Sequence, residues 1–181
     1  MMMNAATVLD FWFSELSAKD WFSKNDQLDK RIANRFGEVL AAAKEGECWQ
    51  WRESARGRLA EIIVLDQFSR NIYRDSPRAF AQDPMALVLA QEAVAKGVDR
   101  ELKATEKAFL YMPYMHSESL VIHEQALRLY KQPGLENNYD FEVKHLDILK
   151  RFGRYPHRNA ALGRTSSAAE QEFLEQPDSS F

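Results

Sequence analysis

Residues 55–72 carry apolar side chains around nearly the whole circumference of a predicted helix. The apolar positions are Leu59, Ile62, Ile63, Val64, Leu65, Phe68 and Ile72. A surface helix needs only one apolar stripe, so a helix that is apolar all round belongs in the middle of a bundle. This segment predicts an all-α fold in which other helices surround it.

Helix-start and helix-stop residues divide the rest of the chain into further helices, and the alternation typical of strands almost never occurs. The predicted helices run from Ala5 to about Leu16, from Asn25 or Asp26 to Gly46, from Ala55 to about Ile72, from Asp83 to Lys96, from Thr105 to a break at Pro113, from a cap at Ser117 to about Gln132, from Asn137 or Asn138 to Gly153, and from a capping box at Ser167 and Glu170 to before Pro177. Short loops between them imply antiparallel neighbours, and hence stacked helical hairpins. We predict one α-helical domain over residues 1–181.

Charge and cysteine content exclude several kinds of partner. The net charge of −3 and the pI of about 5.9 provide no field that recruits nucleic acid or an anionic membrane. The single Cys48 forms no internal disulfide, no secretory leader is recognisable before Phe13, and the longest aliphatic run, 62–65, is far too short to cross a bilayer. We predict a cytoplasmic protein without nucleic-acid or membrane partners.

Sequence motifs for metals and cofactors are missing. No HExxH, Gly-rich phosphate loop, GxSxG or repeated CxxC occurs, and one cysteine excludes thiolate zinc clusters. His116 and His123 would share one helix face only if a single helix ran through Ser117, where a cap is predicted instead. We therefore predict neither a metal site nor a cofactor.

The first candidate for a polar site lies on the apolar central helix. Asp66 falls between Ile62 and Leu59 on that helix, and Arg70 follows one turn later. A carboxylate in such surroundings needs a partner, so the structural interpretation is a buried ion pair. The functional interpretation is an Arg70 held rigid by Asp66, so that Arg70 and the neighbouring Asn71 meet a ligand.

Two further candidates involve histidines. His116 and Glu118 flank a predicted helix start, where an anion is favoured, and a His beside a Glu is the smallest acid–base couple. Glu118 in a first helical turn equally complements the helix dipole. His145 lies in the apolar arc of its helix, where a histidine is usually a neutral core residue with one hydrogen bond.

Residues 151–164 contain four Arg and one His but no acidic residue, in a protein whose net charge is negative. Arg suits planar, two-pronged contact with carboxylate or phosphate. The candidate ligand contacts in this stretch are Arg154, His157, Arg158, Asn159 and Arg164. The structural alternative is that the guanidinium groups cap helices and pair with acids elsewhere in the chain.

Four strings in order carry a family resemblance: LDQFSRNIYRDSPRAFAQDP, FLYMPYMHSES, HLDILKRFGRYPHRNAALGR and EQPDSSF. Together they resemble the bacterial domain-of-unknown-function family 924 from about Leu9 to Phe181. The resemblance implies an all-α, tetratricopeptide-like fold with irregular hairpins, and it implies no activity. One departure is Ser69, where relatives often carry proline. The family positions matched here are Asp66, Gln67, Arg70, Asn71, His116, Ser117, Glu118, His145, Arg151, Gly153, Arg154, Pro156, His157, Arg158, Asn159, Gly163 and Arg164.

The leading functional hypothesis is a pocket that binds a small anionic molecule or an acidic peptide. Its lining would be Arg70, Asn71, His116, Glu118, His145, Arg154, His157, Arg158, Asn159 and Arg164. The alternative is an acid–base enzyme, a hydrolase or transferase acting on a phosphorylated or carboxylated substrate. In it His116 or His157 would be the base, Glu118 its orienter, and Arg154 or Arg158 the charge stabiliser. The third is a protein-interaction scaffold with an aromatic groove at Trp49, Trp51 and Tyr73.

Overall fold

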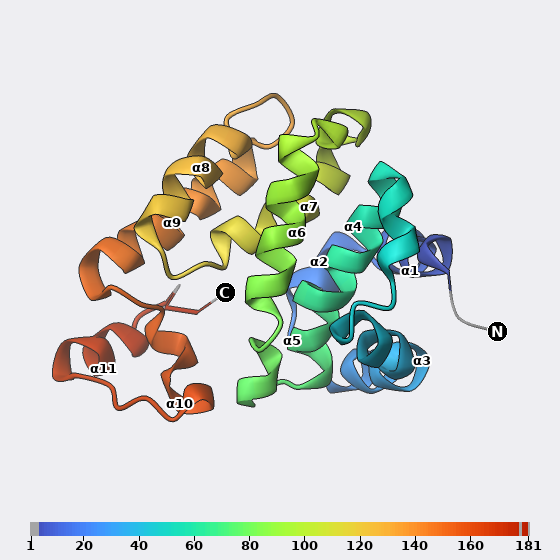
Figure 1. Cartoon of the computed structure of the whole chain (residues 1–181). Coiled ribbons are helices and arrows are strands. Elements are labelled where there is room, and N and C mark those ends of the chain that lie inside the picture. The colour runs from blue at the N-terminus through green and yellow to red at the C-terminus, as the bar shows by residue number, and fades with distance from the viewer. Residues whose placement is uncertain (1–3, 178, 181) are drawn as a thin grey trace.

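A computed structural model of the chain describes residues 4–177, 179 and 180, and helices joined by short connections make up most of it (Figure 1). Within these residues no strand occurs, so the predicted all-α class is confirmed. The helices are α1 (Ala5–Asp10), α2 (Ala18–Phe22), α3 (Asp26–Lys44), α4 (Ala55–Ile63), α5 (Ser69–Ile72), α6 (Asp83–Ala95), α7 (Ala104–Met115), α8 (Leu120–Tyr130), α9 (Glu136–Phe152), α10 (Asn159–Leu162) and α11 (Ala168–Leu174). Short π- and 3₁₀-helical segments lie between them: η1 (Phe11–Glu15), η2 (Trp49–Glu53), η3 (Val64–Phe68), η4 (Pro77–Ala79), η5 (Val98–Glu101) and η6 (Pro156–Arg158).

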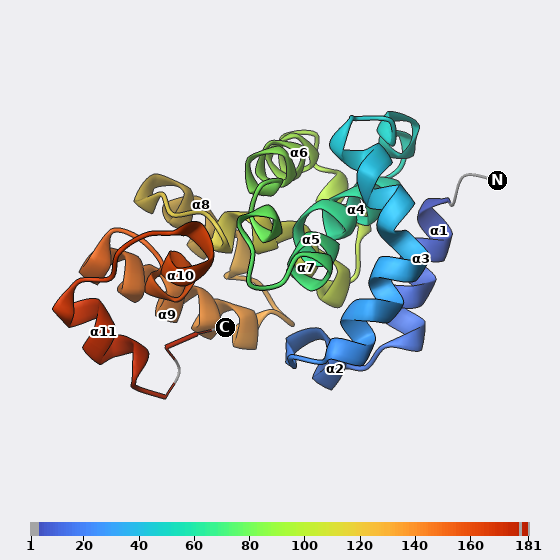
Figure 2. The same cartoon turned by 90° about the horizontal axis from the view of Figure 1, so that it is seen from below.

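The central helix is continuous over α4, η3 and α5, as its apolar circumference predicts. Ser54 caps its start by accepting the N–H of Gly57, and the whole of α4 and η3 is buried apart from Arg56. The π-helical η3 inserts an extra residue into the helical repeat and thereby turns the following residues relative to α4. Helices α1, α6 and α7 pack against α4, while α3 packs against η3 and α5 (Figure 2).

Apolar side chains form one large cluster and one small one. The large cluster extends from Val8 to Leu135 and includes a set of contacting rings, among them Trp12 and Phe109 at 5.5 Å between centroids. The small cluster lies in the C-terminal part of the chain and consists of Ile148, Leu149, Tyr155 and Phe173. Figure 1 shows α9, α10 and α11 on one side of α6 and α7, with α1 to α5 on the other.

Two predicted helix boundaries around α7 and α8 are wrong. Helix α7 runs through Pro113 to Met115; because Pro113 lies in the last turn, its missing N–H costs the helix a single late hydrogen bond. Ser117 caps a turn rather than a helix, since its hydroxyl accepts the N–H of Ser119, and Ser119 is the residue that precedes α8. The segment 116–119 is therefore a polar connection between two packed helices.

Other predicted boundaries agree with the structure or move slightly. Asn25 caps α3 and the capping box of Ser167 and Glu170 opens α11, both as expected. Helix α9 begins at Glu136, slightly before the expected Asn137 or Asn138. The short helices α2 and α10 were not predicted. No helix in the described part of the chain is long and apolar enough to cross a membrane.

Candidate functional site

Five side chains from distant parts of the chain form a closed ring of polar contacts, which we call the polar ring. It consists of Asp66, Arg70, Asp83, His116 and Arg158. Asp66 Oδ1 lies 2.7 Å from His116 Nδ1 and 3.2 Å from Arg70 Nη1. Arg70 also binds both oxygens of Asp83, at 2.8 and 2.9 Å. Arg158 closes the ring, with Nη1 3.5 Å from Asp83 Oδ2 and Nη2 2.8 Å from the backbone carbonyl oxygen of His116. The ring joins η3, α5, α6 and the end of α7 to η6.

Asp66 is the most buried member of the polar ring, with 1% of its side chain exposed. Burial alone raises the pKa of this carboxyl, but His116 and Arg70 together with the amide of Gln67 outweigh it and hold the pKa well below its usual range. Asp66 is therefore a carboxylate that only accepts hydrogen bonds. Its predicted pairing with Arg70 is confirmed.

His116 is held in one tautomer by Asp66. Because a carboxylate cannot donate, the proton of this hydrogen bond lies on Nδ1 of His116, and the lone pair of the neutral ring lies on Nε2. Burial and the nearby Arg70 lower the pKa of His116, against the opposing effect of Asp66. Nε2 makes no hydrogen bond to any residue that the structure describes, and 16% of the side chain is exposed.

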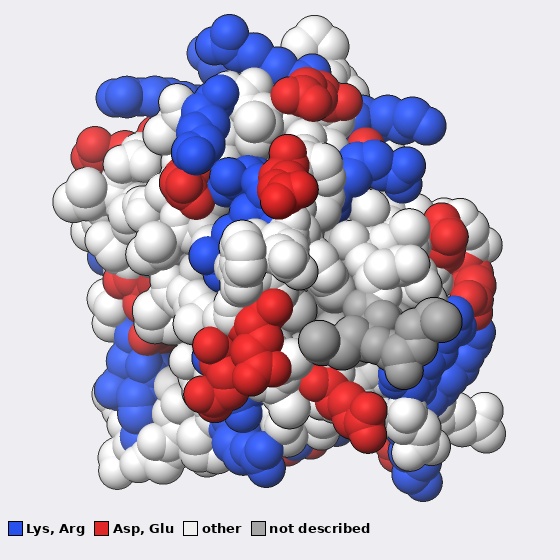
Figure 3. All heavy atoms as spheres, turned by 45° about the vertical axis from the view of Figure 1, so that its right-hand side comes forward, with Lys and Arg blue, Asp and Glu red and all other residues white. Residues whose placement is uncertain are grey.

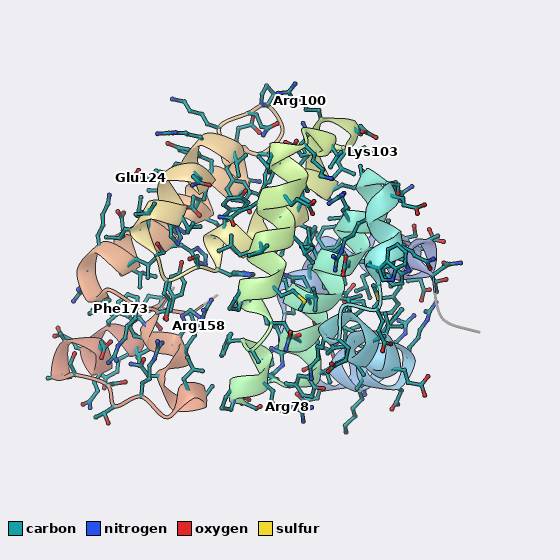
Figure 4. All side chains as sticks on the ribbon, viewed as in Figure 1. Arg78, Arg100, Lys103, Glu124, Arg158 and Phe173 are labelled. Carbon is teal, nitrogen blue, oxygen red and sulfur yellow. The ribbon has the colours of Figure 1, made fainter. Side chains whose placement is uncertain are left out.

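Arg158 differs from the other arginines of residues 151–164. Its guanidinium lies between the rings of Phe80 and Tyr155, 4.7 Å from each centroid, at the boundary between α6 and helices α9 to α11 (Figure 4). A guanidinium has five N–H donors, yet in the described part of the chain Arg158 makes one direct hydrogen bond, to His116. Its Nε is buried without a partner. The residue is 6% exposed.

Arg154 and Arg164 are fully engaged by carboxylates and carbonyls. Arg154 binds both oxygens of Glu170 at 2.7 and 2.8 Å and the carbonyl oxygen of Thr165. Arg164 binds both oxygens of Glu118 at 2.8 and 2.9 Å, and its Nε donates to Asn159. These contacts favour the structural alternative for Arg154, Arg164 and Asn159.

Glu118 and Asn71 also have partners outside the polar ring. Glu118 accepts the backbone N–H of Tyr155 at 2.7 Å in addition to Arg164. The carboxylate that orients His116 is Asp66, so the expectation that Glu118 does so was wrong. Asn71 donates to Asp29 of α3 at 2.8 Å, and its amide is used in holding α3 against α5.

A second buried network lies beside the polar ring and was not predicted. His123 Nδ1 is 2.5 Å from Glu142 Oε1, and both side chains are fully buried. His123 Nε2 contacts the carbonyl oxygen of Ser117 at 2.7 Å and the hydroxyl of Tyr155 at 3.1 Å. The Tyr155 hydroxyl donates to the carbonyl oxygen of Met115 at 2.6 Å. The network ties α9 and η6 to the connection between α7 and α8.

His145 is a buried neutral ring, and His157 is a partly buried neutral ring. Burial lowers the pKa of His145 to about 3, although its Nδ1 donates to the carbonyl oxygen of Phe141 at 2.7 Å. Burial and the adjacent Arg158 lower the pKa of His157 to about 4. The predicted core environment of His145 is confirmed.

These two histidines predict acid lability. Below pH 6.5 these histidines are protonated in the unfolded chain but stay neutral in the folded chain. The free energy of unfolding therefore decreases as the pH falls from 6.5 to the folded pKa values of about 4 and 3. From pH 7 to 5.5 we expect a loss of about 1 kcal/mol for each histidine. Urea unfolding at both pH values measures it. His145→Asn keeps a donor near Nδ1 but does not titrate, so a pH dependence unchanged in this variant would contradict the assignment.

Two surface hollows of the structure lie away from the polar ring. These hollows, of about 550 and 730 Å³, border α2 and α3 and are lined by residues 19–35, with no member of the polar ring among them. Within the described residues, no three His, Cys, Asp or Glu side chains are grouped to hold a metal ion. Figure 3 shows acidic and basic side chains interspersed on one face. Trp49 is 59% exposed, whereas Trp51 and Tyr73 pack partly against the large cluster.

Comparison with known proteins relates this chain to proteins without assigned function. The profile described as "Bacterial protein of unknown function (DUF924)" matches residues 8–178. A solved protein of unknown function from Agrobacterium tumefaciens is 35% identical, with a TM-score of 0.89, and the match covers 96% of this chain and 97% of that one. Among curated proteins none matches.

Proposed function

This chain belongs to the bacterial DUF924 family, whose function is unknown, and we propose that it binds a small anion, a phosphate or carboxylate group, at Arg158 beside His116. The supporting observation is the incomplete hydrogen bonding of Arg158. A buried donor without a partner costs about 1–3 kcal/mol, and a charged one costs more. An oxyanion that accepts hydrogen bonds from this guanidinium would remove that cost.

The surroundings of Arg158 suit an anion anchor. Phe80 and Tyr155 hold the guanidinium plane in place, so little side-chain entropy is lost when a ligand binds. Its contact with Asp83 is long, at 3.5 Å, whereas Arg70 binds the same carboxylate at 2.8 Å. The low exposure of Arg158 favours a small anion over an acidic peptide, whose main chain needs an open groove.

Binding of inorganic phosphate and sulfate tests this proposal. We expect both anions to raise the melting temperature of the wild type by mass action and to give a saturable isotherm in calorimetry. Arg158→Gln removes charge-assisted hydrogen bonds worth about 2 kcal/mol, so binding should weaken about thirtyfold. Arg158→Lys keeps the positive charge but not the planar guanidinium group, so its affinity for the anions should lie between those of the wild type and Arg158→Gln.

The matched control is Arg151→Gln in the same stretch. Arg151 is exposed and stacks on Phe152 and Phe173 without belonging to the polar ring. Anion affinity should therefore be unchanged in this variant. If anion binding weakened equally in the Arg151 and Arg158 variants, the change in net charge would explain the effect, and the proposed site at Arg158 would be wrong.

A second candidate function, an acid–base enzyme acting on a phosphorylated or carboxylated substrate, is supported by the contact between Asp66 and His116. A carboxylate on Nδ1 that leaves Nε2 available is the arrangement by which many enzymes prepare a histidine as a general base. In a screen against phosphate and carboxylate esters, His116→Asn should abolish any activity found in the wild type. A wild type that is silent throughout counts against this candidate and leaves anion binding in place.

A further inference from the structure

We infer that an anion enters the site at Arg158 together with one proton, which His116 accepts on Nε2. This inference rests on the proposed anion site and adds a proton to the binding step. It makes the affinity for the anion dependent on pH.

The charges of the polar ring sum to zero. Asp66 and Asp83 balance Arg70 and Arg158, and His116 is neutral. The exposed fractions of these side chains lie between 1% and 19%. An anion added to this balanced set leaves net negative charge in a poorly solvated place, which is costly. One proton taken up at the same time offsets that cost.

His116 is suited to take this proton. Its Nδ1 proton already points at Asp66, so the lone pair available for protonation is on Nε2. The imidazolium formed keeps its hydrogen bond to Asp66 and gains a second N–H that an anion can accept. No bond other than the new N–H forms in the protein. The proton comes from the solvent or the buffer, because a proton already carried by the ligand would leave the net charge of the site unchanged.

Other charged groups near His116 are less able to accept a proton. Those facing it are Asp66, Arg70, Asp83, Arg158, His145 and His157. The two arginines are already protonated. Asp66 accepts from three side chains, and both oxygens of Asp83 are bound by Arg70. Burial holds the pKa values of His145 and His157 at about 3 and 4, so both rings are poor proton acceptors near neutral pH.

The test is proton-linked binding of sulfate, which carries no titrating proton near neutral pH. Calorimetry in two buffers of different ionisation enthalpy counts the protons taken up. We expect about one proton per bound sulfate for the wild type at pH 7, and an affinity that falls about tenfold per pH unit above pH 7. His116→Asn keeps a donor toward Asp66 but cannot accept the proton. It should bind sulfate without uptake and with little pH dependence.

The outcomes separate this inference from the proposal on which it rests. If neither sulfate nor phosphate binds, both fail. If sulfate binds in an Arg158-dependent way with identical heats in the two buffers, anion binding stands and the proton inference is wrong. Uptake that persists in His116→Asn also overturns it. Nitrogen-15 NMR of the wild type reads Nε2 of His116 directly, and a shift unchanged by sulfate contradicts the inference even if the variant does not fold.

Discussion

Replacing His123 with alanine is expected to lower the free energy of unfolding by about 3–5 kcal/mol. The change removes a fully buried ring and its contacts with Glu142, Ser117 and Tyr155 at once. It leaves a buried carboxyl group and a carbonyl without their partner, in a place that water does not reach. Chemical denaturation of wild type and variant measures the loss.

Glu142→Gln is the matched variant, and its effect depends on where the shared proton lies. Nε2 of His123 carries a proton because the Ser117 carbonyl can only accept. Burial raises the pKa of Glu142, and its second carboxyl oxygen has no partner among the described residues. Both observations favour a neutral Glu142 that donates the shared proton to Nδ1. Glutamine donates in the same direction. We expect a cost below about 1 kcal/mol; a cost as large as that of His123→Ala would mean a charged pair instead.

Gly57→Ala is expected to destabilise the protein by about 3 kcal/mol, because α4 begins pressed against η2. A Cβ at this position would lie 1.9 Å from the carbonyl oxygen of Trp51 and 2.8 Å from its carbon. Both are backbone atoms, so the chain itself must shift, and such overpacking outweighs the gain in helix propensity, about 1 kcal/mol. Urea unfolding measures the change.

Gly37→Ala is expected to change the free energy of unfolding in the opposite direction, measured by the same urea unfolding. Gly37 lies inside α3, and beyond its chain neighbours and the backbone of its own helix no described atom comes within 4 Å of the added Cβ. Without a clash, the helix propensity of alanine should raise stability by about 0.5–1 kcal/mol. If Gly57→Ala also raises stability, the close approach at Gly57 is absent in solution.

The sequence predicts the helices of this protein better than its site. Helix spacing locates the central helix, and the capping residues Asn25 and Ser167 mark helix starts correctly, because these signals act over a few residues. The break expected at Pro113 is wrong because a proline in a last helical turn is tolerated. Proline alone does not distinguish the two cases.

In the candidate site, spacing along the sequence predicts one side-chain contact but not the others. Arg70 follows Asp66 by one turn, so their contact is predictable. His116, fifty residues from Asp66, and Arg158, forty-two from His116, meet them only through packing of the helices. The same reason hides His123 and Glu142, which lie on different helices. Arg154 and Arg164 belong to a stretch of sequence without acidic residues, but carboxylates distant in sequence neutralise both of them in the structure.

The small apolar cluster has a consequence for how the buried Arg158 exchanges with solvent. Regions with few buried apolar contacts open at lower free energy than the global transition, and the region around η6 and α11 rests on Ile148, Leu149, Tyr155 and Phe173. Polar contacts of Tyr155 and Arg158 with Met115, His116 and Glu118 add to this packing. We expect this region to unfold locally and uncover Arg158 while the large cluster stays folded, so that the local opening equilibrium governs how fast solutes reach the guanidinium.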